Sequence, residues 1–404
     1  MAVRAQVAVA GASRGAEVGD RRRDAVADPS RARRHRLPTP RALDGGARVR
    51  GRDAQGVQPL ERRLTNGLVS VVIVTWNSAP FLRRCLAAVT AQTHQNLELI
   101  HVDNASSDDS IAIVRELAPH ARPIRNDANL GFSAAVNQAV RIAKGEFVLL
   151  LNPDAFLEPD YVSSLVAAFT DKAFGMATGK LLQVDSGLVD SKGIRMTRSG
   201  RHFDIGQGMD DGLRGLAVSR SRGEEAGSGV PRDPETARPR DPVQEVFGVS
   251  GAAAMYRATF IHDVTIGGEF LDEDFFTYRE DADVAWRGRL FGWRAIYVPD
   301  AVAHHVRTVT PEKRRSLSAA TNMHGVKNRF LLRLKNEGLY LAIHNAPFEL
   351  MRDLVVILGT LTIERSSLPA LTWLWKNRRR IMEKRRAIQS RRRVSDRELA
   401  GWFV

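Results

Sequence analysis

The feature that most constrains this chain is a series of strand-like apolar runs separated by helix-like segments. The runs cover residues 69–75, 97–102, 123–125 and 146–151, and apolar side chains recur at helical spacing between them. Strands that alternate with single helices form right-handed βαβ units, which build a parallel sheet covered by helices. We therefore expect an α/β fold with an open, mostly parallel sheet.

Polar side chains follow the carboxyl ends of these predicted strands. Thr75 and Asn77 follow the first, Asp103 the second, Asn129 the third and Asp154 the fourth. In open α/β sheets the ligand binds beyond the carboxyl ends of the strands. The clustering predicts a ligand site at that edge.

Two of these aspartates have a structural and a functional interpretation. Asp103 either stabilises the Ser-rich turn behind it or accepts hydrogen bonds from a nucleotide base or ribose. Asp154 either caps the helix predicted near residue 159 or binds Mg²⁺ or Mn²⁺, which would bridge it to a diphosphate.

A second acidic cluster lies at the start of a predicted helix, where Glu280, Asp281 and Asp283 follow three aromatic residues. It is either a solvated helix start or a partly apolar site, in which burial raises a carboxyl pKa toward that of a general base. Farther along, His304 and His305 end a predicted strand together. Because side chains alternate along a strand, at most one of the two faces the site.

The formal net charge of this 404-residue chain is +14, and it is unevenly distributed. Residues 1–66 hold 15 Arg and 7 acidic residues, and residues 376–404 also carry a net charge of +8, so the middle of the chain is close to neutral. We expect residues 1–66 to be a disordered basic tail; an Arg-rich transit peptide or a translation start near Leu68 are the alternatives. Residues 213–242 lack apolar periodicity and are predicted to form a long surface insertion.

Other features narrow the class of protein. The single cysteine, Cys85, excludes an intrachain disulfide and a cysteine-based zinc site. We expect neither a secretory signal nor an ordinary transmembrane helix, because the chain has no run of 18 apolar residues. Residues 341–404 are predicted to form an amphipathic, basic helical region, either packed on the preceding domain or anchored in the boundary of an anionic membrane.

Six short motifs occur in order along the chain. They are VIVTWNS at 72–78, VDNASSDDS at 102–110, NLGF at 129–132, LLNPDA at 150–155, ED-x-D-x-x-x-R at 280–287 and VP followed by His305 at 298–305. With these motifs, residues 69–335 resemble the inverting family-2 glycosyltransferases of the GT-A fold, especially their rhamnosyltransferase-like branch. The resemblance implies a catalytic domain over residues 67–340.

The resemblance also implies roles for individual residues. Asp281 corresponds to the catalytic base, and Asp154 and His305 to the residues near a divalent cation, with His304 as the offset alternative. Asn152 stands where the family's metal motif usually begins with an acid. The implied substrate-binding residues are Thr75, Asn77, Asp103, Asn129, Gly131, Asn152, Gly251, Glu280 and Asp283.

The implied activity is non-processive transfer of a sugar from a nucleotide-sugar donor to a saccharide acceptor. The branch favours rhamnose from dTDP-rhamnose and an acceptor linked to polyprenyl diphosphate, in cell-envelope polysaccharide synthesis. We accordingly expect a cytoplasmic enzyme at the inner face of the cell membrane, with Mg²⁺ or Mn²⁺ as cofactor.

Two other classes of protein fit less well. A sugar nucleotidyltransferase would carry a Gly-rich, basic phosphate loop after the first strand, but residues 75–79 contain neither Gly nor Lys. A non-catalytic protein that binds nucleic acid or membranes through its tails is the other alternative. No aromatic residues interleave with the N-terminal arginines, so no specific nucleic-acid partner is expected.

Overall fold

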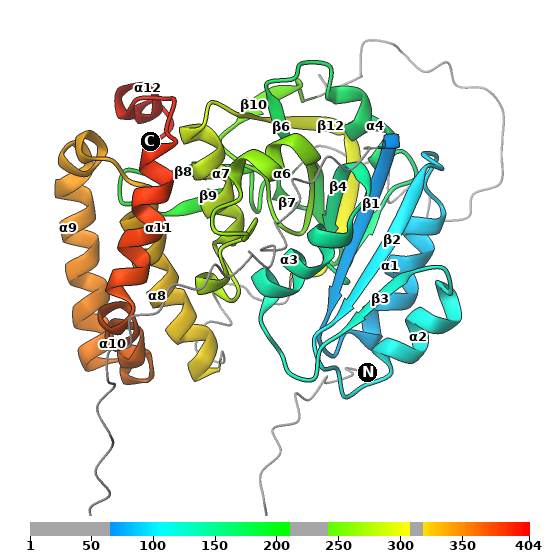
Figure 1. The fold of residues 1–404 in the computed structure, drawn as a ribbon, viewed down its shortest axis with the longest axis horizontal. Helices are drawn as coiled ribbons and strands as arrows, with labels where there is room; N and C mark the ends of the chain where they lie inside the picture. Colours follow the sequence, from blue (N-terminus) through cyan, green and yellow to red (C-terminus); the bar gives the residue numbers. More distant parts are fainter. Residues whose placement is uncertain (1–64, 211–240, 308–317) are drawn as a thin grey trace, which may run out of the picture. The chain divides into compact units, whose positions relative to one another are not determined.

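The computed structural model describes residues 65–210, 241–307 and 318–404, which belong to one compact unit (Figure 1). The predicted tail at 1–66 and the predicted insertion at 213–242 lie almost entirely outside these residues. The compact unit continues through the chain's C-terminal helices, so the boundary predicted at residue 340 separates two parts of one unit.

The described part of the chain has a central sheet in the order β10-β12-β6-β11-β4-β1-β2-β3. Its strands are β1 (Thr65–Thr75), β2 (Leu97–Asp103), β3 (Arg122–Arg125), β4 (Gly145–Leu151), β6 (Phe174–Gln183), β10 (Gln244–Val246), β11 (Ala253–Arg257) and β12 (Arg294–His305), with β5 (Ala155–Leu157) beside β12 and β7 (Val189–Ser191) beside β6. Strands β1 to β4, β6 and β12 run in one direction, whereas β11 and β10 run against their neighbours. This confirms the predicted α/β class with a mostly parallel sheet.

Alternation of side chains along the strands creates a core on each face of the sheet. On β1, Val69, Val71 and Ile73 pack on one face with helices α1 and α4, whereas Val72 packs on the other with α3 and α7. The helices between the described strands are α1 (Ala79–Thr90), α2 (Ser110–Leu117), α3 (Phe132–Ile142), α4 (Tyr161–Ala168), α6 (Ala258–Val264) and α7 (Glu280–Leu290). The β-branched runs are buried on both sides, as expected for parallel strands.

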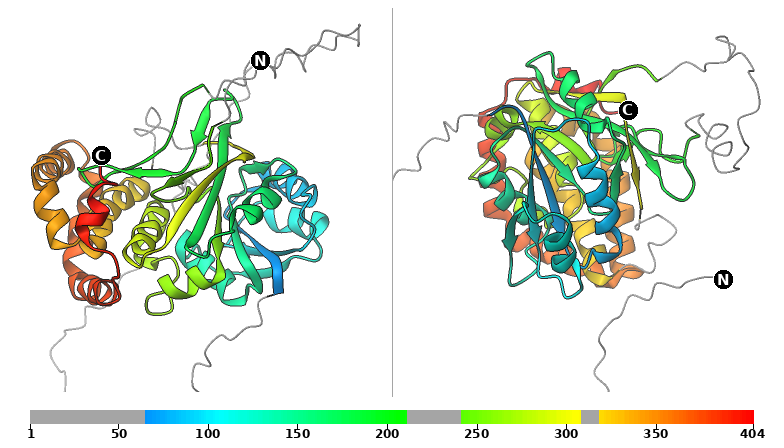
Figure 2. Two further views of the ribbon diagram at one scale, coloured as in Figure 1. Left: turned by 90° about the horizontal axis from the view of Figure 1, so that it is seen from above. Right: turned by 90° about the vertical axis from the view of Figure 1, so that its right-hand side faces the viewer.

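The described C-terminal residues form further helices beside α7, at the end of the sheet away from β3 (Figures 1 and 2). They are α8 (Ala319–Asn336), α9 (Leu339–Thr362), α10 (Leu368–Lys376), α11 (Arg378–Ser390) and the short α12 (Asp396–Ala400). Helices α10 and α11 both pack on α8. The packed arrangement is one of the two that the sequence predicts for this region.

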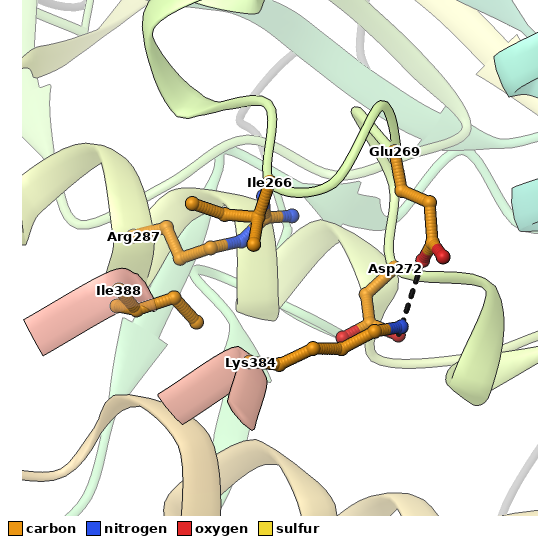
Figure 3. A pocket seen from close by; sticks show the side chains of 6 residues that line it. All are labelled: Ile266, Glu269, Asp272, Arg287, Lys384 and Ile388. Atoms are coloured by element: carbon orange, nitrogen blue, oxygen red, sulfur yellow. Dashed lines mark hydrogen bonds and ion pairs between the residues drawn. The ribbon is translucent and has the colours of Figure 1, made fainter. Parts of the chain in front are cut away.

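Many basic side chains of the C-terminal region pair with acids of the preceding domain. Lys384 on α11 binds Glu269 at 2.8 Å and Asp272 at 2.9 Å, in a small pocket between α11 and the loop before α7 (Figure 3). Arg393 pairs with Asp263 at 2.8 Å. Much of the positive charge near the C-terminus therefore serves packing within the chain.

A buried lysine joins α8 to the loop and helix that hold the second acidic cluster. Lys335 is fully buried and pairs with Asp272 and, at 3.3 Å, with Asp283, which is also fully buried. Asp283 further binds Arg287 at 3.0 Å. Removing one member of a buried ion pair leaves an uncompensated charge in the interior, which is strongly destabilising.

We expect Lys335→Met to lower the free energy of unfolding by roughly 3–5 kcal/mol, because two buried carboxylates each lose one of their two cations. Urea denaturation followed by circular dichroism measures the change. The matched control is Lys144→Met, at an exposed lysine, for which we expect a change within about 0.5 kcal/mol. Equal stability of the Lys335 variant and the wild type would contradict this interpretation.

Candidate active site

The direction of the strands brings the predicted site residues to one edge of the sheet. The carboxyl ends of β1, β2, β4 and β12 meet there, and β11, which runs the other way, begins at the same edge. The side chains that follow these ends come from distant parts of the sequence but lie close together. The sheet thus forms the floor of the site.

A cavity of about 440 Å³ opens at this edge. Its wall combines residues after β4, before β11, at the start of α7 and at the end of β12, together with the hairpin of β8 (Ile194–Met196) and β9 (His202–Asp204). The lining residues are Phe132, Asn152, Asp154, His202, Asp204, Ser250, Gly251, Ala252, Thr277, Tyr278, Arg279, Glu280, Asp281, His305 and Arg307. A volume of this size and a mostly polar lining suit a small polar ligand.

Asp281 is held at the cavity wall by backbone donors. The N–H of Gly251 donates to Asp281 Oδ2 at 3.2 Å, and the N–H of Ala282 donates to Oδ1 at 2.7 Å. Burial nevertheless raises the pKa of Asp281 above its ordinary value. An oriented carboxylate with a raised pKa is suited to accept a proton.

Glu280 stands beside Asp281 and is almost completely buried. Burial and the neighbouring Asp281 carboxylate raise its pKa. Its Oε2 has no hydrogen-bond partner among the described residues. Glu280 therefore loses its proton less readily than an ordinary glutamate.

Asp154 and His305 lie beside each other in the wall of the cavity. His305 Nε2 lies 3.4 Å from Asp154 Oδ1, and its Nδ1 lies 2.8 Å from Asp190 Oδ2. Burial opposes protonation of His305, but hydrogen bonds to Asp154 and Asp190 outweigh it and raise the pKa of His305 to about 9. His304 turns to the other face of β12 and binds Glu158 at 2.9 Å, so the alternation argument is confirmed.

The donor set at Asp154 suits a divalent cation only in part. A carboxylate and an imidazole are suitable ligands for Mn²⁺ or Mg²⁺, and such ions commonly complete their shell with substrate phosphates and water. Among the described residues, no group of three or more His, Cys, Asp or Glu side chains is arranged to hold a metal. A cation here would therefore need oxygen ligands from a substrate.

A second group of predicted residues lies at the ends of β1 and β2. Asp103 is buried; Thr75 Oγ1 donates to its Oδ1 at 3.0 Å and the Ser106 N–H to its Oδ2 at 3.1 Å. Asn77 is exposed and accepts the Ser107 N–H at 2.8 Å. The structure thus gives Asp103 its predicted turn contact and also fixes its orientation at the ligand edge.

Asn129 and Gly131 shape the loop before α3. The N–H of Gly131 donates to Asn129 Oδ1 at 2.9 Å, and Asn104 Nδ2 donates to the Gly131 carbonyl at 3.1 Å. Gly131 has a φ of 86°, and a Cβ there would lie 2.5 Å from the Phe276 ring. Only glycine fits this close approach. The contact joins the loop before α3 to the loop before Asp281.

Asp283 lies away from the cavity, unlike its neighbours Glu280 and Asp281. Its side chain is fully buried and bound by Arg287, Lys335 and, at 2.6 Å, by Asn336. Residues 280 and 281 face the cavity while residue 283 faces α8, because successive helical positions turn by about 100°. Asp283, which the sequence predicts to bind substrate, is therefore not part of the candidate active site.

Several lining residues escaped the sequence analysis. Arg307 pairs with Asp190 at 2.8 Å and also with Asp204, and Arg279 and His202 share the same wall. Strand alternation from His305 could have indicated Arg307, since the two residues are two positions apart. Asp190 and Asp204 come from short strands whose three-residue patterns give little sequence signal.

Comparison with solved structures gives weak likenesses to glycosyltransferases. TarS of S. aureus matches 70% of this chain and 42% of its own at 18% identity and a TM-score of 0.43. The mannosyltransferase PcManGT of Pyrobaculum calidifontis, solved with GDP-Man and Mn²⁺, matches 80% of this chain and 85% of its own at 18% identity and a TM-score of 0.43. Both TM-scores are below 0.5, so these likenesses carry no weight in assigning the family.

Sequence comparison finds a longer match. The chain is 28% identical over 258 residues to the N-acetylglucosaminyl-diphospho-decaprenol L-rhamnosyltransferase of Mycobacterium tuberculosis, which covers 59% of this chain and 76% of the relative. A shorter stretch of 105 residues is 36% identical to the chondroitin synthase of Escherichia coli, covering 25% of this chain and 15% of that protein.

The family comparison covers the strands of the central sheet except β12, and it includes Thr75, Asp103 and Asp154. Residues 70–264 match the model described as glycosyl transferase family 2. The matched segment includes β1 to β4 and ends with α6, and the predicted order of motifs agrees with it. Residues 70–264 therefore form a domain of the glycosyl transferase family 2 type.

Proposed function

We propose that this glycosyltransferase moves a sugar from a nucleotide-diphosphate donor to an acceptor hydroxyl with inversion, and that Asp281 is its general base. The observation that carries the proposal is the geometry of Asp281, whose two oxygens are fixed by backbone N–H groups at the wall of a 440 Å³ cavity. In inversion the acceptor oxygen attacks the anomeric carbon directly. Asp281 accepts the hydroxyl proton as that oxygen attacks.

The donor's nucleotide is assigned to the group at the ends of β1 and β2. Asp103 offers a buried, oriented carboxylate to a base or ribose, and Asn77 lies exposed beside it. We assign Asn129, Gly131 and Asn152 to the part of the donor between the nucleotide and the sugar, and Gly251 and Glu280, at the cavity wall, to the sugar or the acceptor. This order follows the edge of the sheet from β2 to β4.

The cavity is also the proposed site of a divalent cation, Mg²⁺ or Mn²⁺. Asp154 would hold it together with oxygens of the donor diphosphate, and His305 would join them only after losing the proton that its raised pKa favours. When bound, the cation would stabilise the negative charge of the departing nucleoside diphosphate. Asp190 keeps His305 oriented toward Asp154 through its hydrogen bond to Nδ1.

The donor and acceptor follow from the relative named above. Its name specifies L-rhamnose as the transferred sugar and an acceptor linked to a polyprenyl diphosphate. On this basis we propose dTDP-rhamnose as donor, a saccharide on polyprenyl diphosphate as acceptor, and a role in cell-envelope polysaccharide synthesis. The enzyme would then act in the cytoplasm, at the inner face of the membrane.

An exposed apolar surface supports a position at a membrane. Most of the large apolar side chains that the described residues expose lie on α9, the turn after it and α10. We call them the α9 surface: Leu339, Tyr340, Ile343, Phe348, Leu350, Met351, Leu354, Val355, Leu358, Leu361, Ile363 and Trp375. Trp375 is 69% exposed, with the Arg378 guanidinium 4.5 Å from its ring centre. Apolar and Trp side chains with adjacent Arg are typical of proteins that lie in the boundary of an anionic bilayer.

The length and apolar character of the described helices bear on whether the α9 surface would lie on a membrane or cross it. Within the described ranges, no single helix has the length and apolar character needed to cross a bilayer. Helices α9 and α10 together meet those criteria but are bent by 107° relative to each other. We therefore propose contact of the α9 surface with the bilayer boundary.

The first prediction concerns the general base. Asp281→Asn should lower kcat about 10²–10⁴-fold while leaving nucleotide affinity unchanged, because the amide cannot accept the proton. In the wild type, kcat/KM should rise with pH through an apparent pKa above that of an ordinary aspartate, since the proton acceptor must be ionised. Initial rates over pH 4–9 measure kcat and the pH dependence of kcat/KM. Calorimetric titration with the nucleotide measures its affinity. Asp185→Asn, at an exposed aspartate in a turn, is the control. Near-wild-type turnover of Asp281→Asn would exclude this role.

The second prediction concerns the nucleotide. Asp103→Ala should weaken binding of the nucleoside diphosphate by roughly 10-fold or more, because a charge-assisted hydrogen bond is worth about 1.5–3 kcal/mol. Titration with dTDP and UDP measures it. Asp127→Ala, at an exposed aspartate beyond β3, provides the comparison. Unaltered affinity would rule out contact between Asp103 and the nucleotide.

The third prediction concerns the α9 surface. The double variant Leu354→Asp with Leu358→Asp should lose binding to vesicles that contain anionic phospholipid, since it brings two charges into the apolar face. Cosedimentation with anionic and with zwitterionic vesicles measures binding. Leu117→Asp, at an exposed leucine on α2, is the control. Retained binding of the double variant, with an unchanged unfolding midpoint, would refute the membrane contact.

A further inference from the structure

The loop that leads into Asp281 has a strained backbone. Phe276, Tyr278 and Arg279 have φ angles of 66°, 66° and 72°, which lie in the left-handed region. Residues other than glycine adopt this region at a cost and persist there only where neighbouring groups hold them. Since Glu280 and Asp281 follow directly, the conformation of residues 276–279 sets the direction in which Asp281 points.

One side chain of α8 binds three carbonyls of this loop. Asn328 Nδ2 lies 3.0 Å from the Phe275 carbonyl oxygen, 2.7 Å from that of Thr277 and 2.8 Å from that of Tyr278. Asn328 is fully buried. An amide nitrogen carries two hydrogens, so the three carbonyls share them. One side chain thus accounts for hydrogen bonds to three backbone carbonyls of the loop before Asp281.

The amide oxygen of Asn328 indicates that the side chain acts only as a hydrogen-bond donor. Asn328 Oδ1 is buried and has no hydrogen-bond partner among the described residues. A buried, unpaired acceptor is unfavourable. The site therefore uses Asn328 purely as a donor, and an acceptor in its position would face three carbonyl oxygens.

Neighbouring contacts hold the loop from two sides. His324, one turn earlier on α8, stacks on the Phe276 ring with centroids 4.8 Å apart. On the opposite side, the Ser133 N–H of α3 donates to the Phe276 carbonyl at 3.3 Å. The loop is therefore clamped between α3, which belongs to the nucleotide side of the site, and α8, which belongs to the C-terminal helices.

We propose that Asn328 is a positioning residue for the reaction. It stabilises the left-handed loop at residues 276–279 and thereby directs the Asp281 carboxylate toward the cavity. The inference rests on the proposed role of Asp281 as general base. Asn328 itself lies outside the cavity wall and touches no substrate, so its effect is on the orientation of Asp281.

The test compares Asn328→Ala, which removes both donors, with Asn328→Ser, which retains one donor. We expect Asn328→Ala to lower kcat about 100-fold, the usual effect of a displacement near 1 Å, with the donor KM within about twofold of wild type. The kcat of Asn328→Ser should lie between that of Asn328→Ala and that of the wild type. The pH–rate profile of Asn328→Ala should also shift, because the Asp281 environment changes. Asn322→Ala, on the first turn of the same helix, is the matched control and should leave all values unchanged.

Hydrogen–deuterium exchange of the full chain gives a readout that needs no substrate. Peptides covering residues 273–283 should exchange faster in Asn328→Ala, whereas peptides from β1 and β4 should not change. Unchanged exchange in this loop, or faster exchange with a wild-type kcat, would overturn the proposal. If neither variant folds, Asn328 supports the fold as a whole and the proposal is likewise wrong. An inactive wild type with all nucleotide sugars would instead contradict the proposed function, and the exchange experiment would still test the loop.

Discussion

The structure depends on the pairing of charges that are buried between α7 and α8. Asp283 has no access to solvent, and a carboxylate in such a place must be neutralised by cations and hydrogen bonds. Arg287 supplies a cation from the same helix, and Lys335 supplies another from α8. Because Lys335 also binds Asp272, the loop before α7 is tied to the same point. The direction of Asp281 is therefore set by residues that take no part in the chemistry.

This pairing explains why three nearby carboxylates differ so much. Asp281 accepts hydrogen bonds from backbone N–H groups and keeps contact with the cavity. Glu280 has few partners, and its pKa is raised by burial and by Asp281. Asp272, by contrast, is held well below its ordinary pKa by Lys335 and Lys384, whose attraction outweighs its burial. Lys335 and Lys384 thus neutralise Asp272 on the side of α8 and α11, whereas Asp281 faces the cavity.

The sequence was sufficient for the parallel half of the fold because that half has a strong local signal. Runs such as 69–75 and 146–151 are mostly apolar, and the structure has strands there. Strand β6 and the hairpin of β8 and β9 were not predicted; β6 pairs with β11 and β12, which are far away in sequence. The hairpin strands have three residues each, too few for a periodic pattern. Pairings between distant segments leave little trace in local composition.

Candidate site residues could be predicted where they end a strand, as Asp103 does, or follow one within three residues, as Asp154 does. The orientation of Asp283 could not be predicted, since it depends on Lys335 about 50 positions later in the chain. The contacts of Asn328 could not be predicted either, because its partners are backbone carbonyls, which every residue carries. What a sequence motif gives is the residue type at a position; packing decides which way it faces.

The segment that matches the family ends at Val264, yet the proposed chemistry uses residues from well beyond it. Asp281 and His305 complete the cavity, and the ring of Phe403, close to the end of the sequence, packs 4.9 Å from that of Trp286 in α7. A fragment cut at residue 264 would lose the proposed base. A fragment cut at residue 340 would retain Lys335 but remove Lys384 and Phe403 from the helix and loop that support Asp281. In this protein, the segment that matches the family is smaller than the unit that the proposed catalytic residues require.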